Sequence, residues 1–185
     1  MRSMWHIWPS GISRESCGEI LSLPRESLMD GRIGINTERS GLETGIRKSK
    51  MSMFPHHSDQ AKAINDLISP FVIMANRESF GFSLNGFREF QYSEYRDNGF
   101  YGWHQDVQWL QDRESQRKIS VTVQLSDDDY AGGDFEFHND IPQPTGIRGI
   151  GTVIVFPSMF YHQVTPVTMG IRKSLVGWYE GACFT

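Results

Sequence analysis

The sequence predicts a mainly β fold, a double-sheet jelly roll with flanking helices. From about residue 80 onward, short apolar segments alternate with turn residues at the spacing of a sandwich or barrel. Aromatic residues make up 12% of the chain, which favours strands with large side chains between sheets. The length of 185 residues fits one domain with a sizeable core.

Two amphipathic helices are expected before residue 80. The first covers 13–23, with Ser16 and Glu19 at capping-box spacing and Pro24 at its end. The second covers 58–69, with Ser58 as its N-cap and Pro70 as its stop. We expect both helices to brace one outer face of the β core.

The apolar pattern after residue 115 predicts four strands. Residues 119–126 alternate between apolar and polar side chains, which predicts a strand buried on one face. Phe135 and Phe137 continue the alternation after a turn, and the apolar run 151–157 predicts a strand buried on both faces. Residues 171–179 form the last strand, after a turn at Gly170.

Composition and charge exclude several classes of protein. The net charge of −4 leaves no basic stripe, which argues against nucleic acid as a partner, and the basic cluster 47–50 is interpreted as a solvated turn. Cys17 and Cys183 are too few for a cysteine-rich zinc site or a disulfide framework, and we expect them reduced. With no signal-like or membrane-spanning apolar run, we expect a cytoplasmic protein with no membrane partner. Nothing in the sequence indicates the oligomeric state.

Three His-x-Asp triplets are candidate metal-binding motifs. His57 and Asp59 lie at a helix start, where capping explains the polar residues. His138 and Asp140 enter a loop, and a solvated loop tip explains them. The third triplet, 104–106, follows an aromatic-rich stretch, and its i, i+2 spacing on a strand would point His104 and Asp106 to one face.

His162 is the best-placed third ligand, because it follows the buried run 151–161 and precedes the segment 163–167. Two imidazoles and a carboxylate form the facial triad of non-haem Fe(II) oxygenases, although a zinc hydrolase uses similar ligands. Arg172 lies just past the turn at Gly170, and Ser174 shares its strand face. A guanidinium beside a hydroxyl suits a buried carboxylate and favours the oxygenase.

From about residue 76 to 179 the chain resembles the 2-oxoglutarate- and Fe(II)-dependent oxygenases, in their prolyl 4-hydroxylase-like branch. It is most similar to small bacterial and phage members. Five motifs occur in the family's order. They are Tyr95 with the run 99–106, the strand 117–126, the segment 130–134, residues 151–164 with His162, and residues 166–178 with Arg172.

The resemblance implies a double-stranded β-helix, or cupin-like, fold and a single domain over 1–185. The catalytic motifs would lie in 92–179, with residues 1–90 buttressing the core. The implied cofactors are Fe(II), 2-oxoglutarate and O2, with ascorbate as a reductant. The implied iron ligands are His104, Asp106 and His162. The implied cosubstrate residues are Arg172, Ser174, Tyr95 and Gln124, and the implied substrate residues are Tyr101, Arg117 and Trp178.

The implied reaction is hydroxylation of an unactivated C–H bond with release of succinate and CO2. The first expected substrate is a prolyl residue in a peptide or protein, followed by another amino-acid side chain or a small molecule. Arg172 stands where strict prolyl hydroxylases often carry lysine. Three alternatives stay open: a non-catalytic binding module, a zinc hydrolase, and an AlkB-type nucleic-acid demethylase. The acidic chain and Trp178, in place of a second arginine, disfavour the demethylase. Residues 25–56 are expected to form a lid or substrate edge.

Overall fold

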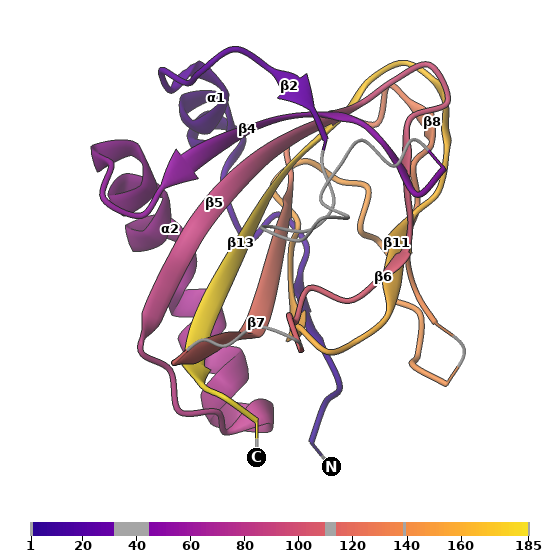
Figure 1. Ribbon diagram of the computed structural model, residues 1–185. Helices are drawn as coiled ribbons and strands as arrows, with labels where there is room; N and C mark the ends of the chain where they lie inside the picture. The colour runs from indigo at the N-terminus through magenta and orange to yellow at the C-terminus, as the bar shows by residue number, and fades with distance from the viewer. Residues whose placement is uncertain (1, 32–44, 110–113, 139, 185) are drawn as a thin grey trace.

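Two antiparallel sheets face one another in the computed structural model, which describes residues 2–31, 45–109, 114–138 and 140–184 (Figure 1). Two helices cover the outer face of the larger sheet, on the left of Figure 1, and the smaller sheet stands on the right. The mainly β, jelly-roll prediction is confirmed.

The larger sheet has seven strands within the described residues. Their order across the sheet is β1 (His6–Trp8), β10 (Val153–Pro157), β7 (Ser115–Gln124), β13 (Arg172–Ala182), β5 (Gly86–Tyr95), β4 (Lys50–Pro55) and β2 (Met29–Asp30). The three long central strands, β7, β13 and β5, are neighbours in this sheet, so they form one continuous surface.

The smaller sheet has four strands in the described part of the chain, in the order β3 (Arg47–Lys48), β6 (Phe100–His104), β11 (His162–Val164) and β9 (Phe135–Phe137). A separate pair joins β8 (Ala131–Gly132) to β12 (Val167–Met169). The smaller sheet therefore brings together strands that are far apart in the sequence.

The first helix, α1, runs from Arg14 to Ser22 and is capped one turn earlier than predicted. The Ser13 hydroxyl accepts a hydrogen bond from the backbone N–H of Ser16 at 3.0 Å, so Ser13 is the N-cap and Ser16 belongs to the first turn. The predicted Ser16–Glu19 capping box is therefore wrong. Cys17 and Ile20 face the core as expected. Both cysteines are free.

The second helix, α2, runs from Asp59 to Ala75, and a π-helical turn, η1 (Asn76–Phe80), follows it. Ser58 is the N-cap, as predicted, but Pro70 does not stop the helix. Pro70 is exposed, and the carbonyl that loses its N–H partner belongs to the exposed Asp66, where water can bond it. Burial of Val72 and Ala75 on the sheet favours continuing the helix past the proline.

Strand β7 is buried on both faces, so the prediction of a single buried face is wrong. Its apolar residues pack beneath the helices; these are Ile119, Val121 and Val123. The alternate residues Ser120, Thr122 and Gln124 are also buried, although they are polar. Their face of the larger sheet is turned toward the smaller sheet and not toward solvent. The same alternation along β13 places Arg172 and Ser174 on that inner face.

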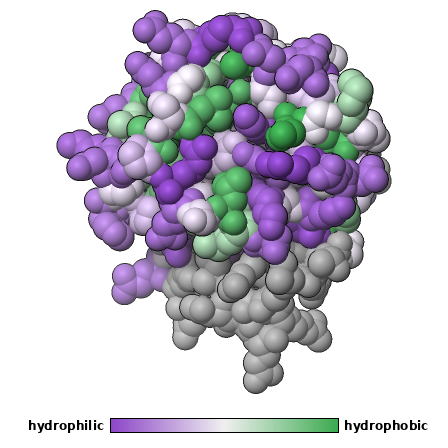
Figure 2. Space-filling view, turned by 90° about the horizontal axis from the view of Figure 1, so that it is seen from above, coloured by the Kyte–Doolittle hydropathy of each residue, from purple (hydrophilic) through white to green (hydrophobic). Residues whose placement is uncertain are grey.

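The apolar residues on the face seen in Figure 2 form separate groups among hydrophilic ones, without one continuous apolar area. None of the helices in the described ranges is long and apolar enough to span a bilayer.

The packing of α2 against the larger sheet predicts a difference between two isoleucines of that helix. Ile68 is fully buried and Ile73 is 60% exposed. Ile68→Ala should lower the free energy of unfolding by about 2–5 kcal/mol, because it leaves a cavity. Ile73→Ala should change it by less than about 0.5 kcal/mol. Denaturant unfolding of both variants checks this, and equal losses would contradict the described packing.

Candidate metal centre and active-site pocket

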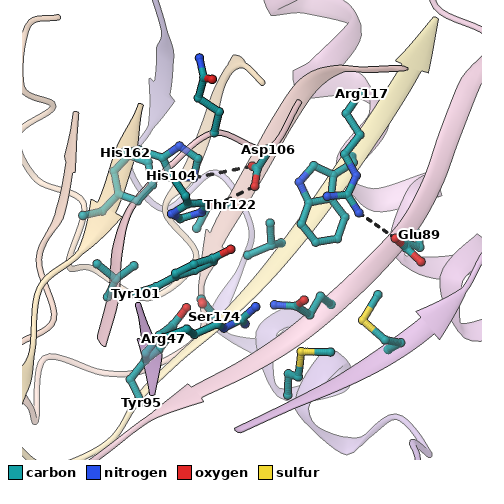
Figure 3. Close-up of a pocket in the computed structure, with 18 of the residues that line it drawn as sticks. Arg47, Glu89, Tyr95, Tyr101, His104, Asp106, Arg117, Thr122, His162 and Ser174 are labelled. Atoms are coloured by element: carbon teal, nitrogen blue, oxygen red, sulfur yellow. Dashed lines mark hydrogen bonds and ion pairs between the residues drawn. The ribbon is translucent and has the colours of Figure 1, made fainter. Parts of the chain in front are cut away.

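A cavity of about 570 Å³ opens between the two sheets (Figure 3). Its floor is the inner face of β5, β13 and β7, and its opposite wall is β6 and β11. The residues that line it include His104, Asp106, His162, Arg172, Ser174, Tyr95, Tyr101, Arg117 and Trp178. Nine of the ten residues predicted for the site therefore meet in one cavity.

The pairing of β6 with β11 brings the two histidines together. His162 and His104 are direct cross-strand partners, and their ring centroids are 4.2 Å apart. The register shifts between this pair and the next one, Val164 with Tyr101. The shift places one more residue on β6 than on β11, which is the pattern of a β-bulge. Tyr101 and His104, three residues apart, consequently both face the cavity.

Asp106 lies beyond the end of β6, which stops at His104, so the prediction that both residues share a strand is wrong. The chain bends after the strand, and the Ser158 carbonyl accepts hydrogen bonds from the backbone N–H groups of Asp106 and Val107, each at 3.0 Å. The bend still turns the carboxylate toward the histidines. Its Oδ1 lies 3.7 Å from His104 Nε2, and its Oδ2 lies 3.6 Å from His162 Nε2.

The ring orientation of both histidines is set by backbone carbonyls. His104 Nδ1 bonds to the Gly102 carbonyl at 2.8 Å, and His162 Nδ1 bonds to the Phe160 carbonyl at 2.9 Å. Because each Nδ1 donates its proton to a carbonyl, each Nε2 carries a free lone pair. Both Nε2 atoms face the Asp106 carboxylate (Figure 3).

Aromatic rings hold the imidazoles in place. Tyr101 stacks on His104 with centroids 3.5 Å apart and an interplanar angle of 13°. Phe135 stacks on His162 at 5.4 Å, and Phe156 meets its edge at 4.8 Å. Burial also raises the pKa of Tyr101 to about 12, so its hydroxyl stays protonated.

His104 and Asp106 are in the protonation states that a metal needs. Burial, followed by the nearby His162, lowers the pKa of His104 to about 3. Burial raises the pKa of Asp106, but the two histidines, Arg117 and the hydrogen bond from Ser120 outweigh it and lower that pKa to about 2. A neutral imidazole and an ionised carboxylate are the metal-binding forms of these groups.

The three ligand atoms lie within 4.8 Å of one another, and within the described residues no other group of three His, Cys, Asp or Glu side chains meets this condition. The other two triplets do not join it. Ser58 caps α2 beside the exposed His57, as expected. His138 is exposed and contacts the edge of Trp103.

Arg172 opens β13 on the floor of the cavity and is only 2% exposed. It is the cross-strand partner of Tyr95, whose ring centroid lies 5.5 Å from its Cζ. One terminal nitrogen bonds weakly to the Ser174 hydroxyl at 3.4 Å, and the other has no hydrogen-bond partner among the described residues. A buried guanidinium in this condition is costly unless an anion binds to it.

Gln124 does not line the cavity, unlike the other three residues predicted to bind the cosubstrate. It is buried as the cross-strand partner of Ser174, and its amide nitrogen donates to the Tyr130 hydroxyl at 3.0 Å. Its amide oxygen has no partner in the described part of the chain. Gln124 thus lies beside Ser174 on the inner face of the larger sheet, just outside the cavity lining.

The far side of the cavity carries a second buried cation. The Cζ atom of Arg117 lies 3.7 Å from the centroid of the Trp178 ring. The Arg117 guanidinium pairs with Glu89 at 2.9 Å (Figure 3). Burial lowers the pKa of Arg117, although the carboxylates of Asp106 and Glu89 oppose that shift. The Trp178 Nε1 and the Arg117 Nε are buried and have no hydrogen-bond partner among the described residues.

Sequence reasoning missed several residues of the cavity. The prediction of a solvated turn at 47–50 is wrong for Arg47, which is 5% exposed and lies over the Tyr101 ring at 4.5 Å. Strand β3 pairs with β6, and that pairing carries Arg47 into the cavity wall. Met51, Met53, Glu89 and Gln91 also line it. Residues 45–56 therefore form an edge of the pocket, while the 32–44 part of the predicted lid lies outside the described residues.

The sequence model of the 2OG-Fe(II) oxygenase superfamily matches residues 90–180, a span that contains the histidine–aspartate trio and Arg172. This span of the chain belongs to the 2OG-Fe(II) oxygenase superfamily. Residues 1–89 lie outside this match, although Arg47 and Glu89 line the same cavity.

The curated proteins that the chain resembles include PKHD-type hydroxylases. The chain is 36% identical over 86 residues to one from Synechococcus sp. (strain CC9902), which covers 43% of this chain and 36% of that protein. It is also 36% identical over 90 residues to one from Teredinibacter turnerae, which covers 46% of this chain and 40% of that protein. The matched region is thus well under half of each relative's length.

Solved structures share the fold over nearly the whole chain. A Pseudomonas putida prolyl-4-hydroxylase has a TM-score of 0.70 at 19% identity, covering 97% of this chain and 94% of that one. The viral collagen prolyl hydroxylase of Paramecium Bursaria Chlorella virus-1, solved as a 2OG complex, has a TM-score of 0.69 at 18% identity, covering 97% of both chains. A Trichoplax adhaerens prolyl hydroxylase in complex with a peptide has a TM-score of 0.71 at 14% identity, covering 96% of this chain and 83% of that one.

The buried, neutral His104 predicts an acid-sensitive fold in protein stripped of metal. Its folded-state pKa of about 3 lies below the ordinary value of 6.5, so the unfolded chain binds one more proton between these values. The free energy of unfolding should therefore fall by about 1.4 kcal/mol per pH unit as the pH drops through this window. Unfolding titrations from pH 7 to 4 should show that His104→Gln removes this part of the slope and that His57→Gln does not. An unchanged slope in His104→Gln would show that the imidazole is not held neutral by burial.

Proposed function

We propose that this chain is a 2-oxoglutarate- and Fe(II)-dependent dioxygenase that hydroxylates an unactivated C–H bond, with a prolyl residue of a peptide or protein as its first candidate substrate. One observation carries the proposal. Two imidazoles and a carboxylate converge on one side of a cavity whose floor holds a buried arginine with an unpartnered terminal nitrogen. A metal beside a carboxylate-binding cation is the requirement of 2-oxoglutarate chemistry.

The donor set fits Fe(II). His104 and His162 would each bind through Nε2 and Asp106 through its carboxylate, which makes a facial triad that leaves three positions open. A zinc hydrolase would use the same three side chains, but it leaves the buried Arg172 guanidinium without a role. When bound, the iron supplies the oxidative step, in which 2-oxoglutarate becomes succinate and CO2 and one oxygen atom enters the C–H bond.

Arg172 would bind the distal carboxylate of 2-oxoglutarate. Its unpartnered nitrogen supplies a charge-assisted hydrogen bond, and Ser174 and Tyr95 lie beside it on the cavity floor. The Gln124 side chain can also contribute to this carboxylate site if its amide group is rotated so that the oxygen and the nitrogen exchange places. The amide oxygen then accepts a hydrogen bond from the Tyr130 hydroxyl, and the amide nitrogen is free to donate toward the Ser174 side.

Support for a peptide substrate comes from the far side of the cavity. The indole Nε1 of Trp178 and the Nε of Arg117 are buried donors that lack acceptors within the described residues. A peptide carbonyl supplies an acceptor of this kind, and Tyr101 offers an aromatic wall beside the metal trio. The names of the curated relatives and of the structural neighbours are consistent with this choice.

The first test is formation of succinate. With Fe(II), 2-oxoglutarate and air, the chain should release succinate, and a proline-containing peptide should raise the rate and gain one oxygen atom in mass. His104→Ala should abolish turnover, because the triad has no redundant ligand. His57→Ala, which alters a histidine in an equivalent His-x-Asp triplet, should leave the rate unchanged. Succinate without any peptide effect would refute the prolyl assignment, and no oxygen-dependent succinate would refute the oxygenase.

The second test concerns Arg172. Arg172→Gln should raise the KM for 2-oxoglutarate about 10- to 100-fold, because a charged hydrogen bond to the distal carboxylate is lost. Arg172→Lys should retain part of the affinity, since it keeps the charge without the planar fork. Lys173→Ala is the matched control, because its side chain points to the opposite face of β13. Steady-state kinetics measure all three, and a KM for Arg172→Gln within twofold of the unsubstituted chain would contradict the assignment.

A further inference from the structure

Two buried serine hydroxyls stand behind the Asp106 carboxylate. The Ser120 Oγ lies 2.7 Å from Asp106 Oδ2 and 2.9 Å from the Ser158 Oγ. Both serines are fully buried. Ser120 belongs to β7, and Ser158 follows β10, the strand that pairs with β7. Neither residue lines the cavity, so neither can touch a substrate.

The direction of the hydrogen bonds in this chain follows from the donor inventory. An ionised carboxylate only accepts, so Ser120 donates its single proton to Asp106 Oδ2. The Ser120 proton is then used, and Ser158 must be the donor in the contact between the two hydroxyls. The result is a one-way relay from Ser158 to Ser120 to Asp106, in which each bond polarises the next.

Only one of the two Asp106 carboxylate oxygens receives a hydrogen bond from this pair of serines. Oδ2 faces His162 Nε2 at 3.6 Å and accepts a hydrogen bond from Ser120, whereas Oδ1 faces His104 Nε2 at 3.7 Å and receives no hydrogen bond from the described residues. A carboxylate that bound a metal through both oxygens would occupy one of the positions that the keto acid and O2 require. The hydrogen bond from Ser120 occupies one lone pair of Oδ2 and fixes the carboxylate, which favours metal binding through Oδ1.

Resting on the proposed function, we infer that Ser120 and Ser158 are positioning residues that hold Asp106 as a one-oxygen ligand and thereby set the metal affinity of the site. Ser158 has a second, separable contribution. Its backbone carbonyl holds the bend at Asp106 and Val107, and that contact does not involve its hydroxyl. Removing only the Ser158 hydroxyl therefore weakens the relay and leaves the bend in place.

The experiment measures the binding of Mn(II) alone, by the electron paramagnetic resonance signal of the free ion. Ser120→Ala should weaken the Kd about 10- to 100-fold, as expected when an outer hydrogen bond to a metal ligand is removed. Ser158→Ala should weaken it less, because the Ser120 hydroxyl remains. Ser120→Thr keeps a hydroxyl on the same carbon and should restore an affinity close to that of the unsubstituted chain.

Ser52→Ala is the matched control. Ser52 is as fully buried as Ser120 and lies in the same sheet, but its hydroxyl donates to the Glu26 carbonyl, away from the site. Thermal unfolding without metal distinguishes a structural role of Ser120 from its role in positioning Asp106. A purely structural role lowers the midpoint in Ser120→Ala and Ser52→Ala alike and leaves the Kd for Mn(II) unchanged, and that result would overturn the inference. If Ser120→Ala does not fold, Ser158→Ala decides, and a Kd equal to that of the unsubstituted chain overturns the inference equally.

The failure of the proposed function has a different signature. If the unsubstituted chain binds no Mn(II), the metal site itself is wrong. If the unsubstituted chain binds Mn(II) and the hydroxyl-deleting variants bind it equally well, only the role of the two serines is wrong.

Discussion

The cross-strand pairing of His162 with His104 is the constraint on which the rest of the site depends. It joins β11 to β6, two short strands separated by most of the second half of the chain. The bulge beside this pair lets Tyr101 stack on His104 while both side chains face the cavity. Slipping one of the two strands by one residue would turn its imidazole to the opposite face, away from Asp106. The chemistry of the site therefore rests on one register in the smaller sheet.

The larger sheet contributes a polar interior, which is unusual for a buried surface. Ser120, Thr122 and Ser174 lie on the inner face, and the opposite face of the same strands forms the apolar core beneath the helices. In these strands, the side chains that face the helices contribute to packing, and the side chains that face the smaller sheet contribute to the site. The cost of burying polar groups falls on β7 and β13, two long strands that are paired along both edges, so that their backbone is held by neighbours on each side.

The sequence predicted the ligands and the arginine because their chemistry is local, as in His104 with Asp106 or Arg172 with Ser174. Alternating polar and apolar residues look the same whether the polar face borders solvent or a polar cavity. The alternation in β7 therefore predicts one exposed face, whereas both faces are buried. Arg47 lay in a run of charges and resembled a surface turn, because its burial arises from the pairing of β3 with β6. Pro70 was expected to end a helix that tertiary packing extends. The contact between Ser120 and Ser158 spans 38 residues and leaves no local pattern.

The most direct test of the central claim is an anaerobic crystal structure of the chain with Mn(II) and 2-oxoglutarate. The account predicts one metal ion bound by His104 Nε2, His162 Nε2 and the Asp106 carboxylate, with the far carboxylate of the keto acid against the Arg172 guanidinium. A metal bound at other residues, or a keto acid whose far end points away from Arg172, would contradict it.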